Sequence, residues 1–299
     1  MKNLLFVCNA HAGRQGIKQN MYAVLETFQR NGYATTVMLT QNPKDPIRYV
    51  EEMSAGEYDL VVCCGGDGTL DETVNGMMMR RPEDRLPIGY IAAGSTNDFG
   101  RTLHIPMNIK RAAEKAVTGT AFPCDIGRLN DEYFVYVAAF GIMSAITYET
   151  DQRYKNILGY LAYVLSGIKE MSSITSYKMV VQTDNEKVEG EYIFGMVTNS
   201  ESVGGFKSIT GKNVLLDDGV FEVTLIRMPK NPIELQAILA SLISGRMDRR
   251  YIYSTKTAAI SFTCDKMVPW NTDGENGGSF KHVDISNLNK EISFIRDGI

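Results

Sequence analysis

The chain has 299 residues, which is enough for two domains that each bury a core. Hydrophobic residues make up 44% of the chain and charged residues 22%, a composition typical of folded globular proteins that excludes a disordered or fibrous one. The formal net charge of −4 gives no reason to expect a protein that binds nucleic acid.

The five cysteines and three histidines are dispersed along the chain, without the paired spacing of a zinc site or a disulfide framework. We therefore expect reduced cysteines in the core of a cytoplasmic protein. The apolar run at the N-terminus is too short for a signal peptide, and no run approaches the roughly 20 residues of a transmembrane segment. The sequence thus predicts a cytoplasmic protein that is at most peripheral to a membrane.

The first 126 residues alternate between strand and helix patterns. Nearly continuous apolar strands that alternate with helices indicate a parallel sheet covered on both faces. Ligands bind beyond the carboxyl ends of such strands, so the loops that follow the strands are the informative ones. The pattern predicts strands at 4–8, 35–39, 59–64 and 87–93 and helices at 16–31, 45–54 and 69–81.

Beyond residue 126 the segments become longer and alternate in polarity, which is typical of a mainly antiparallel β-sandwich or barrel. The exposed edges of a sandwich also allow a homodimer. Strands are predicted at 132–140, 176–184, 190–199, 219–228, 257–264 and 291–296, and helices at 156–170 and 231–244. In the second helix we interpret the apolar face as core rather than as a lipid-binding surface; it comprises Leu235, Ile238, Leu239, Leu242 and Ile243.

The sequence GGDGT, residues 65–69, lies between the strand at 59–64 and a helix, which is where a nucleotide-binding turn belongs. Glycine lets the main chain approach phosphates closely, and the amides of Gly68 and Thr69 at a helix N-terminus attract an anion. No lysine follows, so this is not a P-loop. A carboxylate at Asp67 has the wrong sign for a phosphate site, and the alternative is that Asp67 caps the helix.

Two further loops follow strands at the same predicted edge. Residues 9–14 (NAHAGR) offer small side chains, amides and Arg14, and residues 92–106 (AAGSTNDFGRTLHIP) offer hydroxyls and amides. Small polar loops after strands are common, but three at one edge of one sheet indicate a phosphate-binding site.

Six motifs follow one another along the chain: GGDGT, GSTNDF, CDIGRLN (124–130), NSESVGGF (199–206), LLDDGVFEV (215–223) and NTDGE (271–275). In this order they resemble the bacterial diacylglycerol kinases and related lipid kinases, which share a catalytic domain with sphingosine and ceramide kinases. GGDGT alone also occurs in NAD kinases and phosphofructokinases, but its combination with GSTNDF and a late DGE separates the lipid kinases from them. The resemblance covers nearly the whole chain.

The resemblance implies an α/β nucleotide-binding domain over residues 1–126, similar to NAD kinases and phosphofructokinases, and a β-sandwich domain over 127–299. It implies transfer of the γ-phosphate of ATP to the hydroxyl of diacylglycerol or a related neutral lipid at the membrane surface, with Mg²⁺ as cofactor. The implied nucleotide contacts are Asn9, Ala10, His11, Ala12, Gly13, Arg14, Thr40, Gly65, Gly66, Asp67, Gly68, Thr69, Leu70, Asp71, Glu72 and Thr96. Arg14 stands where most of the family has lysine, and it replaces the charge but not the shape of that side chain.

The resemblance also assigns the general base to Glu275 and a neighbouring catalytic aspartate to Asp273. A carboxylate within hydrogen-bond reach of the acceptor hydroxyl can take its proton. Without the other motifs, Glu275 would be an exposed turn glutamate.

Two magnesium sites follow from the resemblance. Magnesium prefers carboxylate oxygens and binds together with substrate phosphates. The first site is an acidic cluster around ATP, although two of its members could instead cap a helix and end a strand (Asp98 and Asp125). The proposed cluster comprises Asp67, Asp98, Asp125 and Asp273. The second is a structural site formed by the Asp218 carboxylate and the carbonyls of Leu215 and Val220.

Two other functions fit parts of the sequence. A kinase for a soluble substrate such as NAD would share GGDGT, and a non-catalytic nucleotide-binding regulator would share the nucleotide site. The intact TDGE at 272–275 argues against the regulator, because a degenerate kinase usually loses its base first. The segment GMMMRRP, residues 76–82, is a candidate membrane contact, although consecutive methionines point around a helix and favour a partly buried helix end.

Overall fold

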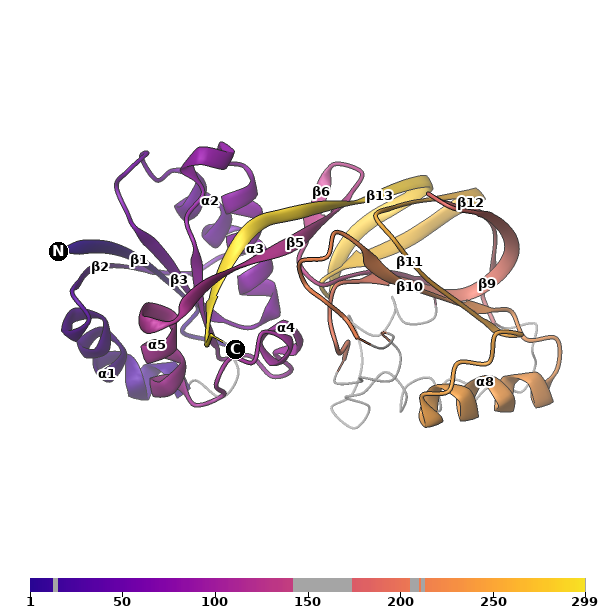
Figure 1. The fold of residues 1–299 in the computed structure, drawn as a ribbon, viewed down its shortest axis with the longest axis horizontal. Coiled ribbons are helices and arrows are strands. Elements are labelled where there is room, and N and C mark those ends of the chain that lie inside the picture. Colours follow the sequence, from indigo (N-terminus) through magenta and orange to yellow (C-terminus); the bar gives the residue numbers. More distant parts are fainter. Residues whose placement is uncertain (13–15, 142–173, 205–209, 211–212, 299) are drawn as a thin grey trace. The chain divides into compact units, whose positions relative to one another are not determined.

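The computed structural model describes residues 1–12, 16–141, 174–204, 210 and 213–298 (Figure 1). The chain divides into two compact units: unit 1 is Met1–Ile126 with Asn289–Ile299, and unit 2 is Gly127–Leu288. The division after residue 126 coincides with the change in sequence pattern. The C-terminal residues, however, belong to unit 1, whereas the sequence pattern assigned them to the second domain. The helix expected at 156–170 lies outside the described residues.

Unit 1 is built on a parallel sheet. Its strands lie in the order β2–β1–β3–β4–β13, and each neighbouring pair is parallel. β3 and β4 are buried along their whole length, which explains why their sequences are apolar without alternation. The bounds are β1 Lys2–Cys8, β2 Tyr33–Leu39, β3 Leu60–Gly65, β4 Ile88–Ala92, β5 Thr120–Leu129, which pairs with β13, and β13 Glu275–Arg296.

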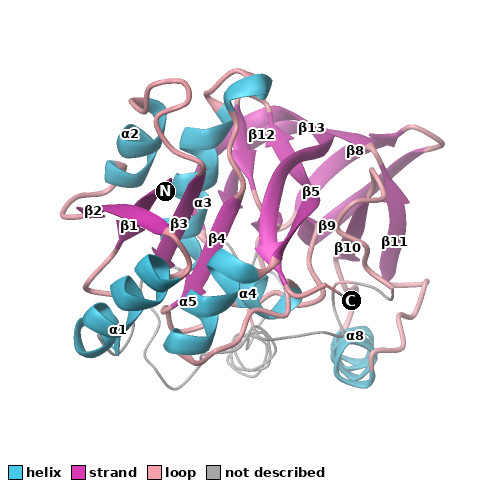
Figure 2. Cartoon of the chain, turned by 60° about the vertical axis from the view of Figure 1, so that its left-hand side comes forward, coloured by secondary structure: helices cyan, strands magenta, loops and turns pink. Residues whose placement is uncertain are grey.

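Helices cover both faces of this sheet. α1 contacts α5 on one face, and α2 contacts α3 on the other (Figure 2). The apolar positions of α1 recur at helical spacing, and one of them, Phe28, meets Phe6 of β1 edge to face with ring centroids 5.3 Å apart. The bounds are α1 Gly16–Arg30, α2 Asp45–Glu51, α3 Asp67–Met78, η1 Pro82–Asp84, α4 Asp98–Thr102 and α5 Ile109–Thr118.

Unit 2 is a β-sandwich-type domain in which the strand pairs are antiparallel. β7 and β8 lie end to end between β9 and β12, and β10 and β11 extend the sheet beyond β9. Its core contains a cluster of aromatic rings. The centroid of the Trp270 ring lies 4.9 Å from that of Phe140 and 5.0 Å from that of Phe262. The bounds are β6 Glu132–Phe134, β7 Val137–Gly141, β8 Tyr177–Thr183, β9 Lys187–Thr198, β10 Phe221–Arg227, α8 Pro232–Ser244, β11 Ile252–Thr257 and β12 Ala259–Thr272.

Several elements differ from the predicted ones. The strand expected at 132–140 is broken into β6 and β7, because the amides between them bond to a side chain, Asp273, instead of continuing one strand. β13 is a single strand of 22 residues, of which the sequence predicted only the end, since the polar stretch SNLNK interrupts its apolar alternation. β5 and β11 were not predicted.

Two expectations about composition can be compared directly with the structure. All five cysteines are free and buried, as predicted. In α8, Leu235, Ile238 and Leu242 are buried as expected, but Ile243 is 68% exposed, so the predicted core face was too wide. In the part of the chain that the structure describes, no helix is both long and apolar enough to span a bilayer.

Candidate functional site

The loops that follow the strands of unit 1 meet at one edge of its sheet. Main-chain hydrogen bonds continue the sheet beyond the strand ends: Asn9 donates to Cys64 (2.8 Å), Thr40 to Cys8 (3.0 Å) and Ala93 to Gly65 (2.8 Å). Because each bond joins one loop to the neighbouring strand, Asn9, Thr40 and Gly65 are held side by side. This is the edge at which an open α/β sheet binds ligands.

Glycine is required where two of these loops touch. A Cβ on Gly94 would lie 2.5 Å from the Cα of Gly66, and a Cβ on Gly65 would lie 2.4 Å from the hydroxyl of Thr69. The Thr69 hydroxyl also accepts a hydrogen bond from the Asn9 amide group at 3.3 Å. The rim of the site is therefore made largely of main chain, and the first-turn amides of α3 lack carbonyl partners within the helix.

Asp67 is the first residue of α3, and the N-cap position is occupied by Gly66. The capping role considered for Asp67 is therefore wrong. Its carboxylate accepts a hydrogen bond from the amide of Asp98 at 3.3 Å, which joins the GGDGT loop to the GSTND loop. Burial, followed by the negative charge of Asp67, raises the pKa of the nearby Tyr90 hydroxyl well above its usual value. Asp67 is thus an anionic bridge between two loops.

Within unit 1, Asp67 and Asp98 of the proposed magnesium cluster lie together, whereas Asp125 has protein partners of its own. Asp125 is fully buried on β5, where its carboxylate accepts hydrogen bonds from the side chain of Asn289 (2.7 Å) and the amide of Lys290 (2.9 Å). No three histidine, cysteine, aspartate or glutamate residues in the described ranges are arranged to hold a metal ion. Asp125 therefore connects β5 to β13 in this structure.

The remaining predicted nucleotide contacts have differing surroundings. His11 donates its amide to the Asn9 side chain (3.0 Å), the Glu72 carboxylate accepts the amide of Lys44 (2.9 Å), and Asp71 accepts the side chain of Asn75 (2.9 Å). Leu70 is 1% exposed, so its side chain belongs to the core rather than to a ligand site. Thr96 is exposed on the loop after β4, Ala10 and Ala12 flank His11, and Gly13 and Arg14 lie outside the described residues.

The methionine segment behaves as a helix end. Met77 and Met78 are buried at the end of α3, whereas Met79 is 55% exposed. The guanidinium of Arg80 donates to the carbonyl of Met53 at 2.6 Å, which anchors the segment to the end of α2. The alternative interpretation, a partly buried helix end, is therefore confirmed over a membrane contact.

In unit 2, Glu275 lies at the tip of the hairpin between β12 and β13. Thr272 pairs with Glu275, so the loop consists of two residues, Asp273 and Gly274, with φ of 51° and 92°. Two positive φ angles are the mark of the tight turns that favour an Asp-Gly sequence. Glu275 is exposed, and its carboxylate makes no hydrogen bond or ion pair with the described residues. The two-residue turn therefore presents an accessible carboxylate.

Asp273 has the opposite environment. It is 4% exposed, and its carboxylate accepts hydrogen bonds from the amides of Val135, Tyr136 (3.0 Å) and Val137 (2.9 Å). The amide of Asp273 in turn donates to the carbonyl of Val137 at 2.9 Å. Asp273 thus fixes the hairpin to the segment between β6 and β7.

The DDG turn at 217–219 carries the carboxylate of the predicted structural metal site. Asp218 accepts the amide of Val220 at 3.3 Å, and Gly219 adopts φ 79°. The donors implied for the ion are a carboxylate and two carbonyls, and Leu215 is 55% exposed. An all-oxygen donor set is what magnesium prefers, so these residues fit the ion in their chemistry.

Two charged residues beside this turn were missed by sequence reasoning. The ammonium of Lys256 lies 2.8 Å from the Glu222 carboxylate and 3.9 Å from that of Asp218. Glu222 is 4% exposed, and its second oxygen has no hydrogen-bond partner among the described residues. Burial raises the pKa of Glu222, and Lys256 partly offsets this effect. The sequence did contain one sign of this pair, because Glu222 is an acidic residue inside the largely apolar strand FEVTLIR.

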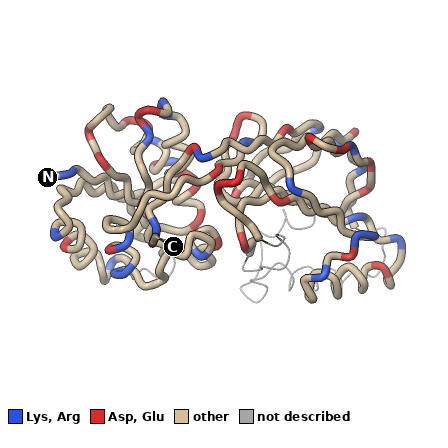
Figure 3. Tube along the Cα trace, viewed as in Figure 1, with Lys and Arg blue, Asp and Glu red and all other residues tan. Residues whose placement is uncertain are grey.

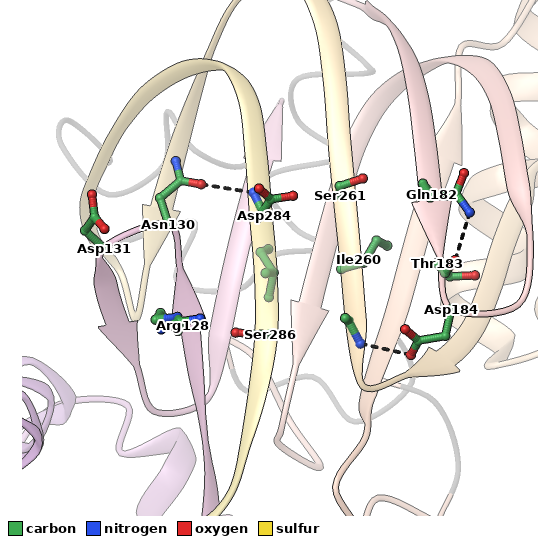
Figure 4. Close-up of a pocket in the computed structure, with 12 residues that line it drawn as sticks. Arg128, Asn130, Asp131, Gln182, Thr183, Asp184, Ile260, Ser261, Asp284 and Ser286 are labelled. Carbon is green, nitrogen blue, oxygen red and sulfur yellow. Dashed lines mark hydrogen bonds between the residues drawn. The ribbon is translucent and has the colours of Figure 1, made fainter.

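A polar depression of about 650 Å³ lies elsewhere on unit 2 (Figure 4). Several of its polar groups are already bonded: Asp184 accepts the amides of Ala258 and Ala259, both at 3.2 Å, and Asn130 accepts the amide of Asp284 at 3.0 Å. None of its lining residues belongs to the predicted site. They are Arg128, Asn130, Asp131, Gln182, Thr183, Asp184, Ala259, Ile260, Ser261, Asp284, Ile285 and Ser286.

Comparison with known families identifies both halves of the sequence. Residues 3–129 match the diacylglycerol kinase catalytic domain, and residues 137–285 match the YegS C-terminal NAD kinase beta sandwich-like domain. These matches bear out the predicted α/β domain and the predicted β-sandwich domain.

Relatives and solved structures agree over almost the full length. The chain is 32% identical to a diacylglycerol kinase of Bacillus subtilis over 280 residues, which cover 93% of this chain and 91% of the relative. It is 30% identical to a diacylglycerol kinase of Staphylococcus haemolyticus over 96% of this chain and 86% of the relative. A crystal structure of a diacylglycerol kinase from Bacillus anthracis shares the fold, with a TM-score of 0.78 at 24% identity over 99% of this chain and 97% of the other. The chain therefore belongs to the diacylglycerol kinase catalytic-domain family and is a lipid kinase of that family.

Proposed function

We propose that this protein transfers the γ-phosphate of ATP to the hydroxyl of diacylglycerol or a closely related neutral lipid, forming phosphatidic acid. The observation that carries the proposal is the exposed carboxylate of Glu275, held at the tip of a two-residue turn. The family match supports the reaction class, and ATP is the phosphate donor that this family uses.

Glu275 is the general base in this proposal. It accepts the proton of the lipid hydroxyl as the bond forms between that oxygen and the γ-phosphorus, while the bond from phosphorus to the bridging oxygen of ATP breaks and ADP leaves. Phosphoryl transfer needs positioning and charge neutralisation more than covalent chemistry, so one well-placed carboxylate is sufficient.

Asp273 contributes to catalysis by orienting Glu275. Its carboxylate is already engaged by three main-chain amides, which leaves it poorly placed to take a proton from substrate. The same bonds restrict the conformations of the turn and so the position of the Glu275 carboxylate. Precise positioning of a general base accounts for a large part of the rate acceleration that it provides.

The glycine-rich edge of unit 1 holds the nucleotide in this proposal. Amides of Gly68 and Thr69 donate to phosphate oxygens, and Asn9 and Thr40 line the same edge. Magnesium, when bound with ATP, would neutralise phosphate charge, and Asp67 is the acidic residue of the GGDGT loop that would assist it. A second magnesium at the DDG turn would be held by the Asp218 carboxylate with the carbonyls of Leu215 and Val220.

The test is a phosphorylation assay with radiolabelled ATP and magnesium, offering diacylglycerol, ceramide, sphingosine and NAD as acceptors. We expect label in phosphatidic acid from the wild-type protein and about a thousandfold less from Glu275→Gln. Glu189→Gln is the matched control, since Glu189 is an exposed strand glutamate of the same unit. Label in NAD alone, or full activity of Glu275→Gln, would overturn the proposal.

A further inference from the structure

Helix α8 of unit 2 is well delimited but carries apolar residues on both of its faces. Asn231 caps its N-terminus by accepting the amide of Glu234 at 3.0 Å, and Gly245 ends it at φ 65°. Leu235, Ile238 and Leu242 form its buried face. A soluble helix normally pairs such a face with a polar one.

The other face of α8 is also apolar, and it is exposed. Ile233 is 77% exposed and Ile243 is 68% exposed. Ala240 and Gln236 lie between them at intervals of three and four residues, so the four side chains form one stripe along the helix, here called the outer stripe. Among the described helices, no other exposes two large aliphatic side chains on one face.

Basic residues border the outer stripe at both ends of the helix. Lys230 precedes α8, and Arg246 and Arg249 follow it; all three are exposed, and none forms an ion pair within the described residues. Residues 230–250 contain four basic and two acidic residues, a local charge of +2 in a chain of net charge −4. Basic segments are visible next to this helix in Figure 3.

We propose that the outer stripe of α8 docks on the surface of an anionic lipid bilayer. Isoleucine side chains enter the boundary between headgroups and acyl chains, and flanking lysine and arginine contact lipid phosphates. Arginine and lysine side chains are long enough to do both, since their stems lie on apolar surface while their heads reach phosphate. The docking surface shares no residue with the Glu275 turn or with the glycine-rich loops.

A lipid surface fits this face better than a second protein molecule. A stable protein interface buries roughly 800 Å² on each partner, which two isoleucines and an alanine fall far short of providing. Basic residues outnumber acidic ones by four to two over residues 230–250, and Asp248 is engaged by Arg250, which leaves Lys230, Arg246 and Arg249 to complement a uniform sheet of phosphates.

The test measures binding, without any reaction. Purified protein is sedimented with vesicles of phosphatidylcholine alone and of phosphatidylcholine mixed with phosphatidylglycerol. We expect binding to the mixed vesicles, a reduction of about tenfold or more in the partition coefficient for Ile233→Gln/Ile243→Gln, and loss of the preference for anionic vesicles for Arg246→Gln/Arg249→Gln. The control Tyr22→Gln/Met107→Gln removes exposed apolar side chains from unit 1 and should bind like the wild type.

Two outcomes would overturn the proposal. One is equal vesicle binding by the wild type and the isoleucine variant, with thermal unfolding showing both to be folded. The other is absence of vesicle binding together with a sedimentation coefficient that falls in the isoleucine variant, which would assign the stripe to a second copy of the chain. Kinase activity on detergent-dispersed diacylglycerol, which needs no bilayer, is expected to be unchanged in the isoleucine variant. Its absence in the wild type would contradict the proposed reaction rather than the docking surface.

Discussion

The GGDGT loop of unit 1 and the TDGE turn of unit 2 both place an aspartate next to glycine, but they use its carboxylate differently. Asp67 accepts one amide from the neighbouring loop, that of Asp98, and stands beside helix amides suited to phosphate. Asp273 accepts three amides and is buried. The carboxylate of Asp67 therefore joins two loops of unit 1, whereas that of Asp273 is held inside unit 2 by consecutive main-chain amides.

The largest effect is expected for Glu275, which follows Asp273 in the TDGE turn. We expect Glu275→Gln to lower kcat about a thousandfold, because the amide cannot take the hydroxyl proton, while affinity for ATP stays within about twofold. Steady-state kinetics and calorimetric titration with ATP measure the two quantities. A kcat close to that of wild type would remove Glu275 from the role of base.

The next largest effect is expected on stability. Asp273→Asn replaces an anionic acceptor of three amides by a group that accepts fewer of them, so the free energy of unfolding should fall by about 3 kcal/mol. Urea unfolding followed by tryptophan fluorescence reports on unit 2, because Trp270 lies in its core. Asp131→Asn, at an exposed position, is the control. Asp67→Asn should cost about 1 kcal/mol or less, and a loss equal to that of Asp273→Asn would break the comparison.

The Lys256–Glu222 pair extends the comparison to a carboxylate with a cationic partner. Lys256→Met leaves the buried Glu222 carboxylate without its counter-charge and should lower the free energy of unfolding at pH 8 by about 2 kcal/mol, less than for a fully buried pair because Lys256 is 39% exposed. Lys187→Met, at an exposed lysine, should have almost no effect.

The pH dependence of this variant has a definite sign. Burial raises the pKa of Glu222 in the folded state, so the unfolded state loses its proton first, and stability falls as pH rises from the unfolded pKa to the folded one. Without Lys256 the folded pKa rises further, so the loss between pH 5 and 8 should be larger in Lys256→Met. Equal losses in variant and wild type would mean that Lys256 does not neutralise Glu222.

The smallest effect is expected at the contact between two glycine loops. Gly94→Ala places a Cβ against the main chain of Gly66, which must shift, so we expect ATP affinity to fall about tenfold and stability by about 1 kcal/mol. Gly298→Ala, where the added carbon meets nothing closer than 3.8 Å, is the control. Unchanged ATP affinity in Gly94→Ala would place the nucleotide away from this contact.

The parts of the site that are local in sequence could be predicted, and those that depend on distant segments could not. GGDGT contains its own strand end, glycines and helix start, and the alternation of strands and helices in unit 1 follows from hydrophobic pattern. The amides that hold Asp273 come from residues 135–137, on the far side of unit 2 in sequence, and no pattern within TDGE reveals them. Glu222 and Lys256 meet only because β10 pairs with β11.

Local pattern also misjudged two elements for physical reasons. β13 continues through the polar stretch SNLNK because main-chain pairing and the bonds from Asn289 and Lys290 to Asp125 replace apolar burial there. In α8 the sequence pattern shows on which side of the helix each apolar residue lies. Only the tertiary structure decides which side is covered, and Ile243 lies on the uncovered side.

The pairing of β13 with β4 also sets an order of events during synthesis. β4 is complete early in translation, yet its neighbour on one side is the end of β13, through Ile88 with Phe294 and Gly89 with Ile295. An ion pair between Arg85 and Glu291 closes the same seam. On the ribosome, one edge of β4 therefore remains unpaired until residues 294–295 have emerged, about 200 residues later, and an unpaired edge is where chains associate wrongly.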